Sequence, residues 1–351
     1  MNPVRVRVAV LSLAVLLPAG VPLAGETPEP APPPPLDARV AALESKIDTL
    51  SLDLDRVRKA VDDVLWYQRV GDVAEIDKVT IVGPPNPRGE ETHGIANARH
   101  PLKIYAYVFT PRKAPEGRRP LLILPHGGVH GDFTTYHAHI VRELMDRGYV
   151  VVAPEFRGST GYGREFKEAI DYGGLEVDDC VAARDWAVEN LAAVDGRRVG
   201  IVGWSHGGMI ALLAGFDHPD KFQAIYAGVP VSDLLARMGY ATDEYRALFS
   251  APHHLGKTAG EAVETYKLRS PAWHAAKLKV PLLVHTTTND RDVSVVEVEH
   301  LIQALKAEDK NFEYKVYEDA PGGHSFNRID TREARASRAE VYAFLAKHLK
   351  P

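Results

Sequence analysis

The chain has 351 residues, 45% hydrophobic and 25% charged, a composition typical of a folded globular protein and not of a disordered or collagen-like one. Its 42 Lys and Arg against 47 Asp and Glu give a net charge of −5, so no overall electrostatic attraction to nucleic acid or anionic lipid is expected. The single cysteine, Cys180, excludes an internal disulfide and a cysteine-rich zinc site. An enzyme or a binding protein remains.

The first 25 residues predict an export signal. Arg5 and Arg7 precede an apolar run over residues 8–17, and small residues follow up to Ala24 and Gly25. A basic start, a short apolar core and a small-residue exit are typical of a cleaved secretory signal peptide. The run is shorter than the roughly 20 residues that span a bilayer. We expect export to a bacterial-type periplasm or the extracellular space, with no stable membrane span after cleavage; the alternative is an uncleaved anchor.

Residues 26–35, ETPEPAPPPP, predict a semi-rigid proline-rich linker. A helical segment is then predicted over 36–71, with Gly71 at its end. Apolar residues recur there at alternating steps of four and three. In a seven-residue repeat with positions a to g, this spacing gives two sets of apolar residues. Position a is occupied by Val40, Ile47, Leu54 and Val61, and position d by Leu36, Leu43, Leu50, Val57 and Val64.

This heptad pattern, over residues 36–64, favours a parallel two-stranded coiled coil, and therefore a homodimer. The flanking charges agree in part, because Arg39 would face Glu44 of the partner and Asp53 would face Arg58. The alternative is an amphipathic helix that packs on its own globular domain.

The chain from residue 75 to 351 alternates strand-like and helical stretches. Apolar runs predict strands at 102–111, 120–128, 149–156, 197–204, 224–231, 281–288 and 312–319. Helical patterns lie between them, at 134–148, 164–170, 175–193, 207–218, 296–309 and 332–349. Several strands are continuous Val/Ile/Leu runs, as expected for a parallel sheet covered on both faces. We predict one doubly wound α/β domain, with the irregular stretch 233–272 as a cap over the site.

Ser205 is the candidate nucleophile. It lies in Gly203-Trp204-Ser205-His206-Gly207, after the strand VGIVG and before the apolar helix MIALLAGF. Small residues on both sides permit the sharp turn that presents the serine hydroxyl at a helix N-terminus. A second glycine motif, His126-Gly127-Gly128, follows the strand LLILP. The backbone N–H groups of Gly128 and His206 could form an oxyanion hole, whereas His126 itself is expected to be structural.

Two further loops supply an acid and a base. Asp290 and Asp292 follow the strand PLLVHTTT, and either could orient a histidine on position alone. His324 follows the last predicted strand, beside Gly322 and Gly323. The order Ser, Asp, His is the one expected of an α/β-hydrolase. Cys180, inside a predicted helix, is expected to be a packing residue.

Over residues 100–350 the sequence resembles the catalytic domain of the prolyl oligopeptidase family of serine peptidases. The supporting segments are HGGVHGDF, FRGSTGYGREF, LEVDDCVAARDWAVE, VGIVGWSHGG, PLLVHTTTNDRDV and GGHSF. In that family the catalytic aspartate lies three residues before a valine, which selects Asp290. Many members also carry a β-propeller, for which the residues before 75 leave no room.

The resemblance implies an α/β-hydrolase fold and a Ser205–His324–Asp290 triad that cleaves peptide bonds through an acyl-enzyme. No metal or cofactor is implied, and nucleic acid is not an expected partner. Without a propeller, a carboxylesterase acting on small or carbohydrate-linked esters is the alternative. A third possibility, a binding protein on an inactive hydrolase fold, is disfavoured by the complete triad. Arg157 and Tyr162 lie in a predicted pocket loop and could either bind substrate or brace the loop.

Overall fold

A computed structural model describes residues 34–85, 101–113 and 117–351. The expected signal, residues 1–25, lies outside this part, as does most of the proline-rich linker. The chain divides into two compact units, Met1–Ile47 and Asp48–Pro351. None of the helices in the described ranges combines the length and the apolar character that a membrane crossing requires.

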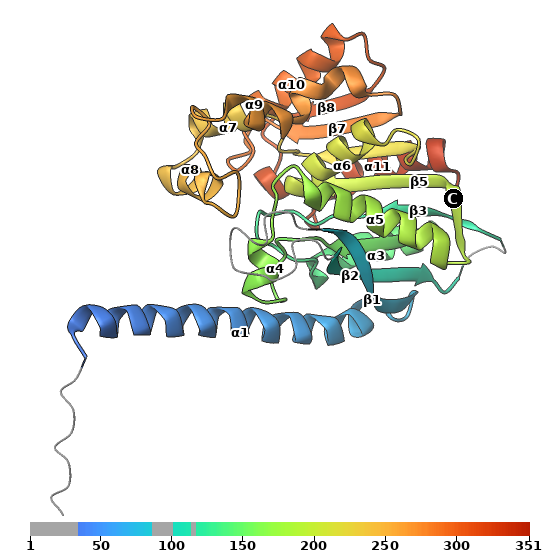
Figure 1. The fold of residues 1–351 in the computed structure, drawn as a ribbon. Helices are drawn as coiled ribbons and strands as arrows, with labels where there is room; N and C mark the ends of the chain where they lie inside the picture. The colour runs from blue at the N-terminus through green and yellow to red at the C-terminus, as the bar shows by residue number, and fades with distance from the viewer. Residues whose placement is uncertain (1–33, 86–100, 114–116) are drawn as a thin grey trace, which may run out of the picture. The chain divides into compact units, whose positions relative to one another are not determined.

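The second unit is built on one eight-stranded sheet with the order β1-β2-β4-β3-β5-β6-β7-β8 (Figure 1). β1 and β2 pair antiparallel, as do β2 and β4, and all later pairs are parallel. The strands are β1 (Ala74–Pro85), β2 (Pro101–Pro111), β3 (Arg119–Ile123), β4 (Val150–Glu155), β5 (Val194–Trp204), β6 (Ala224–Gly228), β7 (Leu282–Thr287) and β8 (Glu313–Tyr317). The predicted α/β-hydrolase architecture is confirmed.

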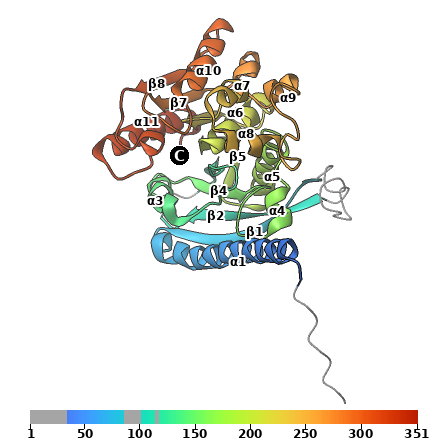
Figure 2. The ribbon, with the colours of Figure 1, turned by 90° about the vertical axis from the view of Figure 1, so that its left-hand side faces the viewer.

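Helices cover both faces of this sheet (Figures 1 and 2). They include α3 (Ala138–Met145), α5 (Leu175–Asn190), α6 (His206–Asp217), α10 (Val295–Ala307) and α11 (Arg332–Leu349). α5, α6 and α10 belong to one apolar layer, and α3 and α11 belong to the other. In β4, Val150 and Val152 enter the first layer while Val151 and Ala153 enter the second. Both faces of the strand are therefore buried, which explains its continuous apolar run.

The main discrepancy is β1, which the sequence analysis did not predict. Its buried positions include Ala74, Ile76 and Ile81, separated by exposed polar residues. An edge strand in which apolar and polar residues do not alternate regularly is harder to recognise in the sequence than a continuous apolar central strand. The predicted cap, residues 233–272, contains three short helices, α7 (Leu234–Tyr240), α8 (Asp243–Ser250) and α9 (Val263–Leu268). Shorter helical pieces of the described residues are α4 (Arg164–Glu168), η1 (Thr135–His137), η2 (Pro271–Lys277) and η3 (Gly323–Ser325).

The heptad segment forms the helix α1 (Leu36–Val70). From Asp48 onward the helix packs on the second unit through one face, where Lys59, Trp66 and Val70 are buried. Its heptad residues in this unit, from Leu50 to Val64, are 50–69% exposed. The alternative of a helix that packs on its own globular domain is therefore confirmed from Asp48 onward, although the packed face is not the one that carries the heptad residues.

Candidate active site

Ser205 occupies a sharp turn between β5 and α6. Its backbone angles are φ 59° and ψ −124°, a left-handed conformation that is strained for any residue with a side chain. The flanking glycines permit the turn, because a Cβ on Gly203 would collide with the Gly207 carbonyl, and one on Gly207 with the Pro125 carbonyl. This is the conformation expected of a nucleophile elbow, and it places Ser205 at the N-terminus of α6.

Asp290 and His324 are joined by a hydrogen bond. The Nδ1 atom of His324 lies 2.7 Å from Asp290 Oδ2. The other oxygen, Oδ1, accepts the backbone N–H groups of Asp292 and Val293, both at 2.9 Å. The Asp290 side chain is fully buried, whereas the His324 ring is 20% exposed. A buried carboxylate at Nδ1 fixes the ring orientation and leaves Nε2 available for proton transfer.

Asp292 has a different environment. Its side chain is 57% exposed and lies 3.2 Å from Arg237, a buried residue of α7. Its nearest approach to His324 is 3.5 Å, and this approach is to Nε2 instead of Nδ1. A carboxylate at Nε2 cannot orient the ring for a reaction at that same nitrogen. Of the two candidate aspartates, Asp290 alone has the geometry of a triad acid.

The chain brings Ser205 and the Asp290–His324 pair to one edge of the sheet. The three residues follow β5, β7 and β8, whose carboxyl ends meet where open α/β sheets bind their ligands. Within the described residues, no hydrogen bond joins the Ser205 hydroxyl to the His324 ring. Such bonds are often long in unliganded enzymes and shorten when substrate binds. An open pocket of about 600 Å³ lies against His324, lined also by Asn289, Arg291, Asp292, Gly322 and Gly323.

The two predicted oxyanion donors are connected through a side chain that the sequence analysis overlooked. Gly128 has φ +84°, a conformation that favours glycine. Its carbonyl lies 3.0 Å from Nδ1 of His206, so the ring of one donor residue holds the loop of the other. Nε2 of His206 lies 3.1 Å from Glu176, a buried residue at the start of α5. No local pattern could link Glu176 and His206, which are 30 residues apart.

His126, two residues before Gly128, is buried. Its Nε2 lies 2.8 Å from the Ser159 hydroxyl, and its ring stacks on Phe156 at 4.2 Å. Burial lowers its pKa to about 3, so the ring is neutral near pH 7. These contacts give His126 a structural role in the described site.

Arg157 and Tyr162 brace their loop. The Arg157 guanidinium donates two hydrogen bonds to Asp179, at 2.7 and 2.8 Å, and both side chains are completely buried. Tyr162 stacks on Tyr105 with 4.5 Å between ring centroids. Cys180, the residue after Asp179, is also buried in the apolar core, as expected for a packing residue.

A comparison with protein-family models matches residues 135–351 to the prolyl oligopeptidase family. Among curated proteins, the acylamino-acid-releasing enzyme of Arabidopsis thaliana is 28% identical over 253 residues, covering 70% of this chain and 33% of that protein. Dipeptidyl aminopeptidase BIII of Pseudoxanthomonas mexicana is 29% identical over 257 residues, covering 70% and 37%. The chain therefore spans about a third of the length of these relatives.

Solved structures show the same likeness. A puromycin-hydrolyzing peptidase of Mycobacterium tuberculosis aligns with a TM-score of 0.65 and 27% identity, covering 79% of this chain and 39% of that one. An acylaminoacyl peptidase in complex with Z-Gly-Gly-Phe-chloromethyl ketone aligns with a TM-score of 0.67 at 18% identity, covering 79% and 42%. The second comparison supports the fold alone.

Proposed function

Because the chain belongs to the prolyl oligopeptidase family of serine peptidases, we propose that it cleaves peptide bonds through an acyl-enzyme on Ser205. The observation that carries this proposal is the strained elbow conformation of Ser205, φ 59°, between β5 and α6. Strain of this kind persists only where the surrounding structure imposes it, and it is characteristic of serine nucleophiles in α/β-hydrolases.

In this mechanism His324 accepts the Ser205 proton through Nε2 while Asp290 holds Nδ1. The serine oxygen attacks the substrate carbonyl, and the backbone N–H groups of Gly128 and His206 stabilise the oxyanion. One such donor contributes about 3 kcal/mol to lowering the barrier. His324 then gives its proton to the leaving amine, and water hydrolyses the acyl-enzyme by the same steps.

The open site supports carboxylesterase activity as the second candidate. In the described ranges every strand belongs to the single hydrolase sheet, and the pocket beside His324 is open. An open pocket of this kind gives small esters access to His324.

A substrate panel separates the two activities. Purified wild-type protein and Ser205→Ala are tested on aminoacyl and peptidyl reporters and on short p-nitrophenyl esters. We expect turnover of the peptide reporters, lost in Ser205→Ala. Turnover of the esters alone would support the carboxylesterase, and wild-type turnover equal to that of Ser205→Ala on every reporter would reject both.

We also propose that the protein is exported and loses residues 1–25. The support is the basic, apolar and small-residue order of that segment. N-terminal sequencing of protein from a periplasmic fraction should begin near residue 26, whereas an intact Met1 in the cytoplasmic fraction would contradict export.

A further inference from the structure

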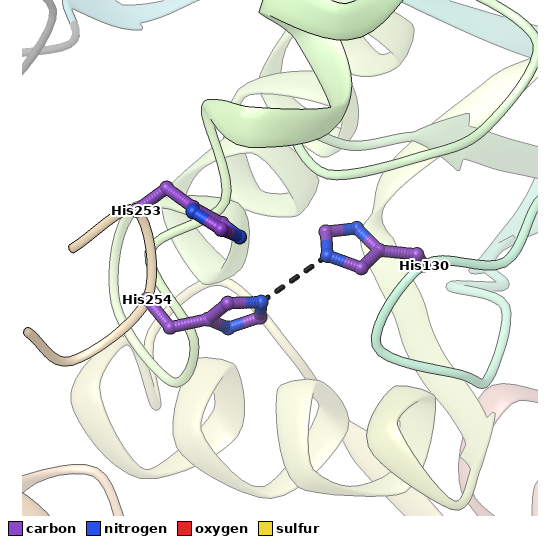
Figure 3. A group of neighbouring side chains, drawn as sticks. All are labelled: His130, His253 and His254. Carbon is purple, nitrogen blue, oxygen red and sulfur yellow. Dashed lines mark hydrogen bonds between the residues drawn. The ribbon is translucent and has the colours of Figure 1, made fainter. Parts of the chain in front are cut away.

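Three histidines converge beside the loop that carries Gly128. His130 comes from the loop after β3, and His253 and His254 come from the cap segment between α8 and α9. Figure 3 shows the three rings turned toward one another. One nitrogen from each ring lies within 4.8 Å of the other two, and the Nε2 atoms of His130 and His254 are 3.1 Å apart.

The surroundings of His130 prepare it to bind a metal. Its Nδ1 lies 3.0 Å from the Gly158 carbonyl oxygen, and because a carbonyl can only accept, Nδ1 carries the proton. Nε2 therefore keeps its lone pair and faces the other two histidines. A backbone carbonyl that holds the far ring nitrogen in this way is characteristic of metal-ligating histidines.

The spacing fits a tetrahedral ion. Zinc–nitrogen bonds of about 2.0–2.1 Å place neighbouring ligand nitrogens about 3.3 Å apart. The His130–His254 pair is already at 3.1 Å. His253 is half-buried, and its ring centroid lies 4.9 Å from that of His254.

We propose that His130, His253 and His254 bind a divalent transition-metal ion of the zinc class, with the fourth position open to water. An all-imidazole ligand set selects such ions over Mg²⁺ and Ca²⁺, which prefer oxygen ligands. The ion would connect the cap to the glycine loop, because His130 is two residues from Gly128. Its role here is to stabilise the cap over the site, separate from the serine chemistry.

Metal titration tests this site. Untagged full-length protein, stripped with a chelator, is titrated with Zn²⁺ by calorimetry and melted with and without the ion. We expect one Zn²⁺ per chain and a higher melting temperature, no saturable Mg²⁺ binding, and tetrahedral absorption bands with Co²⁺. His130→Gln and His253→Gln should each weaken Zn²⁺ binding at least tenfold.

His348→Gln, a change at a histidine of α11 outside the cluster, is the matched control and should bind as wild type does. Circular dichroism of each variant verifies folding. Wild-type protein without saturable Zn²⁺ binding, or equal affinity in the folded cluster variants and the control, would overturn the proposal.

A different observation concerns α1. All nine heptad residues are exposed, by 44–69% of their surface, and they form one apolar stripe from Leu36 to Val64. We call these nine residues the heptad stripe. The buried residues Lys59, Trp66 and Val70 lie on another face of the helix. At 1.5 Å per residue, a stripe of four heptads is about 40 Å long. Monomeric proteins seldom leave a continuous apolar patch of this extent exposed to solvent.

We infer that the heptad stripe pairs with the same stripe of a second copy of this chain. Charge complementarity argues for this occupant: in a parallel pair Arg39 faces Glu44 and Asp53 faces Arg58, so both flanking pairs are attractive. The packed face of α1 is not needed for the pairing.

Light scattering of the full chain tests the dimer. We expect wild-type protein to have twice the chain mass, and Leu43→Glu and Leu50→Glu to have the mass of one chain. Ala42→Glu introduces the same charge at an exposed position outside the stripe and should remain dimeric. A monomeric wild-type protein, or stripe variants with the wild-type mass, would overturn the inference.

Discussion

At the residue scale, the two aspartates near His324 occupy different positions and should differ in function. Asp290 is buried and bonds Nδ1 at 2.7 Å, whereas Asp292 is exposed and pairs with Arg237. Asp290→Asn should lower kcat by about 10⁴, because the amide favours the wrong histidine tautomer. Asp292→Asn should lower kcat by less than about tenfold, because the Asp292 side chain is 57% exposed and does not contact Nδ1 of His324. Equal losses in steady-state assays of the two variants would contradict this assignment.

The His206 ring should act as a positioning group for the oxyanion hole. His206→Phe keeps the backbone N–H and can preserve the stacking on Tyr172, but it loses the bonds to Gly128 and Glu176. We expect kcat to fall by roughly tenfold or more with little change in KM, because a looser donor stabilises the transition state less. Glu176→Gln, which keeps an acceptor oxygen, should retain more activity than His206→Phe. A change in KM alone would contradict the positioning role.

At the element scale, the packing of α1 depends on a buried ion pair. Lys59 contacts Glu155, the Phe133 carbonyl and Asp132. Burial disfavours the charge, but pairing with the two carboxylates prevails and raises the pKa of Lys59. Lys59→Met leaves Glu155 buried without its partner and should lower the free energy of unfolding by about 3–5 kcal/mol.

Chemical denaturation measures this effect. Lys46→Met changes an exposed lysine of the same helix and is the control, with an expected change within about 0.5 kcal/mol. A Lys59→Met protein as stable as the control would show that the pair does not hold the helix.

The sequence predicted α1 well but not how it packs. Its length, ends and heptad pattern are local properties, and the helix ends within one residue of the expected position. No local pattern marks Lys59 as a buried residue, because its acidic partners lie 73 and 96 residues away. β1 was missed for a related reason: it gains its stability from pairing with β2, not from an apolar run of its own.

At the scale of the whole molecule, the hydrolase domain should require part of α1. Trp66 is completely buried and stacks on Phe133 with 5.2 Å between centroids. A chain that begins at residue 72 loses this core side chain together with Lys59, and should unfold at lower temperature or aggregate. A chain that begins at residue 48 keeps both. Equal melting temperatures for the two chains would contradict this requirement.

The site could be predicted only where the chemistry follows local motifs. Ser205, Asp290 and His324 each lie in the segment that follows a strand, and the sheet topology places them at one edge. The Glu176–His206 bridge and the three-histidine cluster join distant segments, and His130 is separated from His254 by 124 residues. Their partners are set by tertiary packing, which no spacing rule encodes.

The central claim, that Ser205 is a nucleophile activated by His324, is tested most directly by covalent labelling. Folded protein is incubated with a fluorophosphonate, and the adduct is located by intact-mass and peptide mass spectrometry. We predict one adduct per chain, on Ser205, and at least a hundredfold slower labelling in His324→Ala, because the hydroxyl loses its general base. Folded wild-type protein without an adduct at Ser205, or a His324→Ala protein labelled at the wild-type rate, would contradict it.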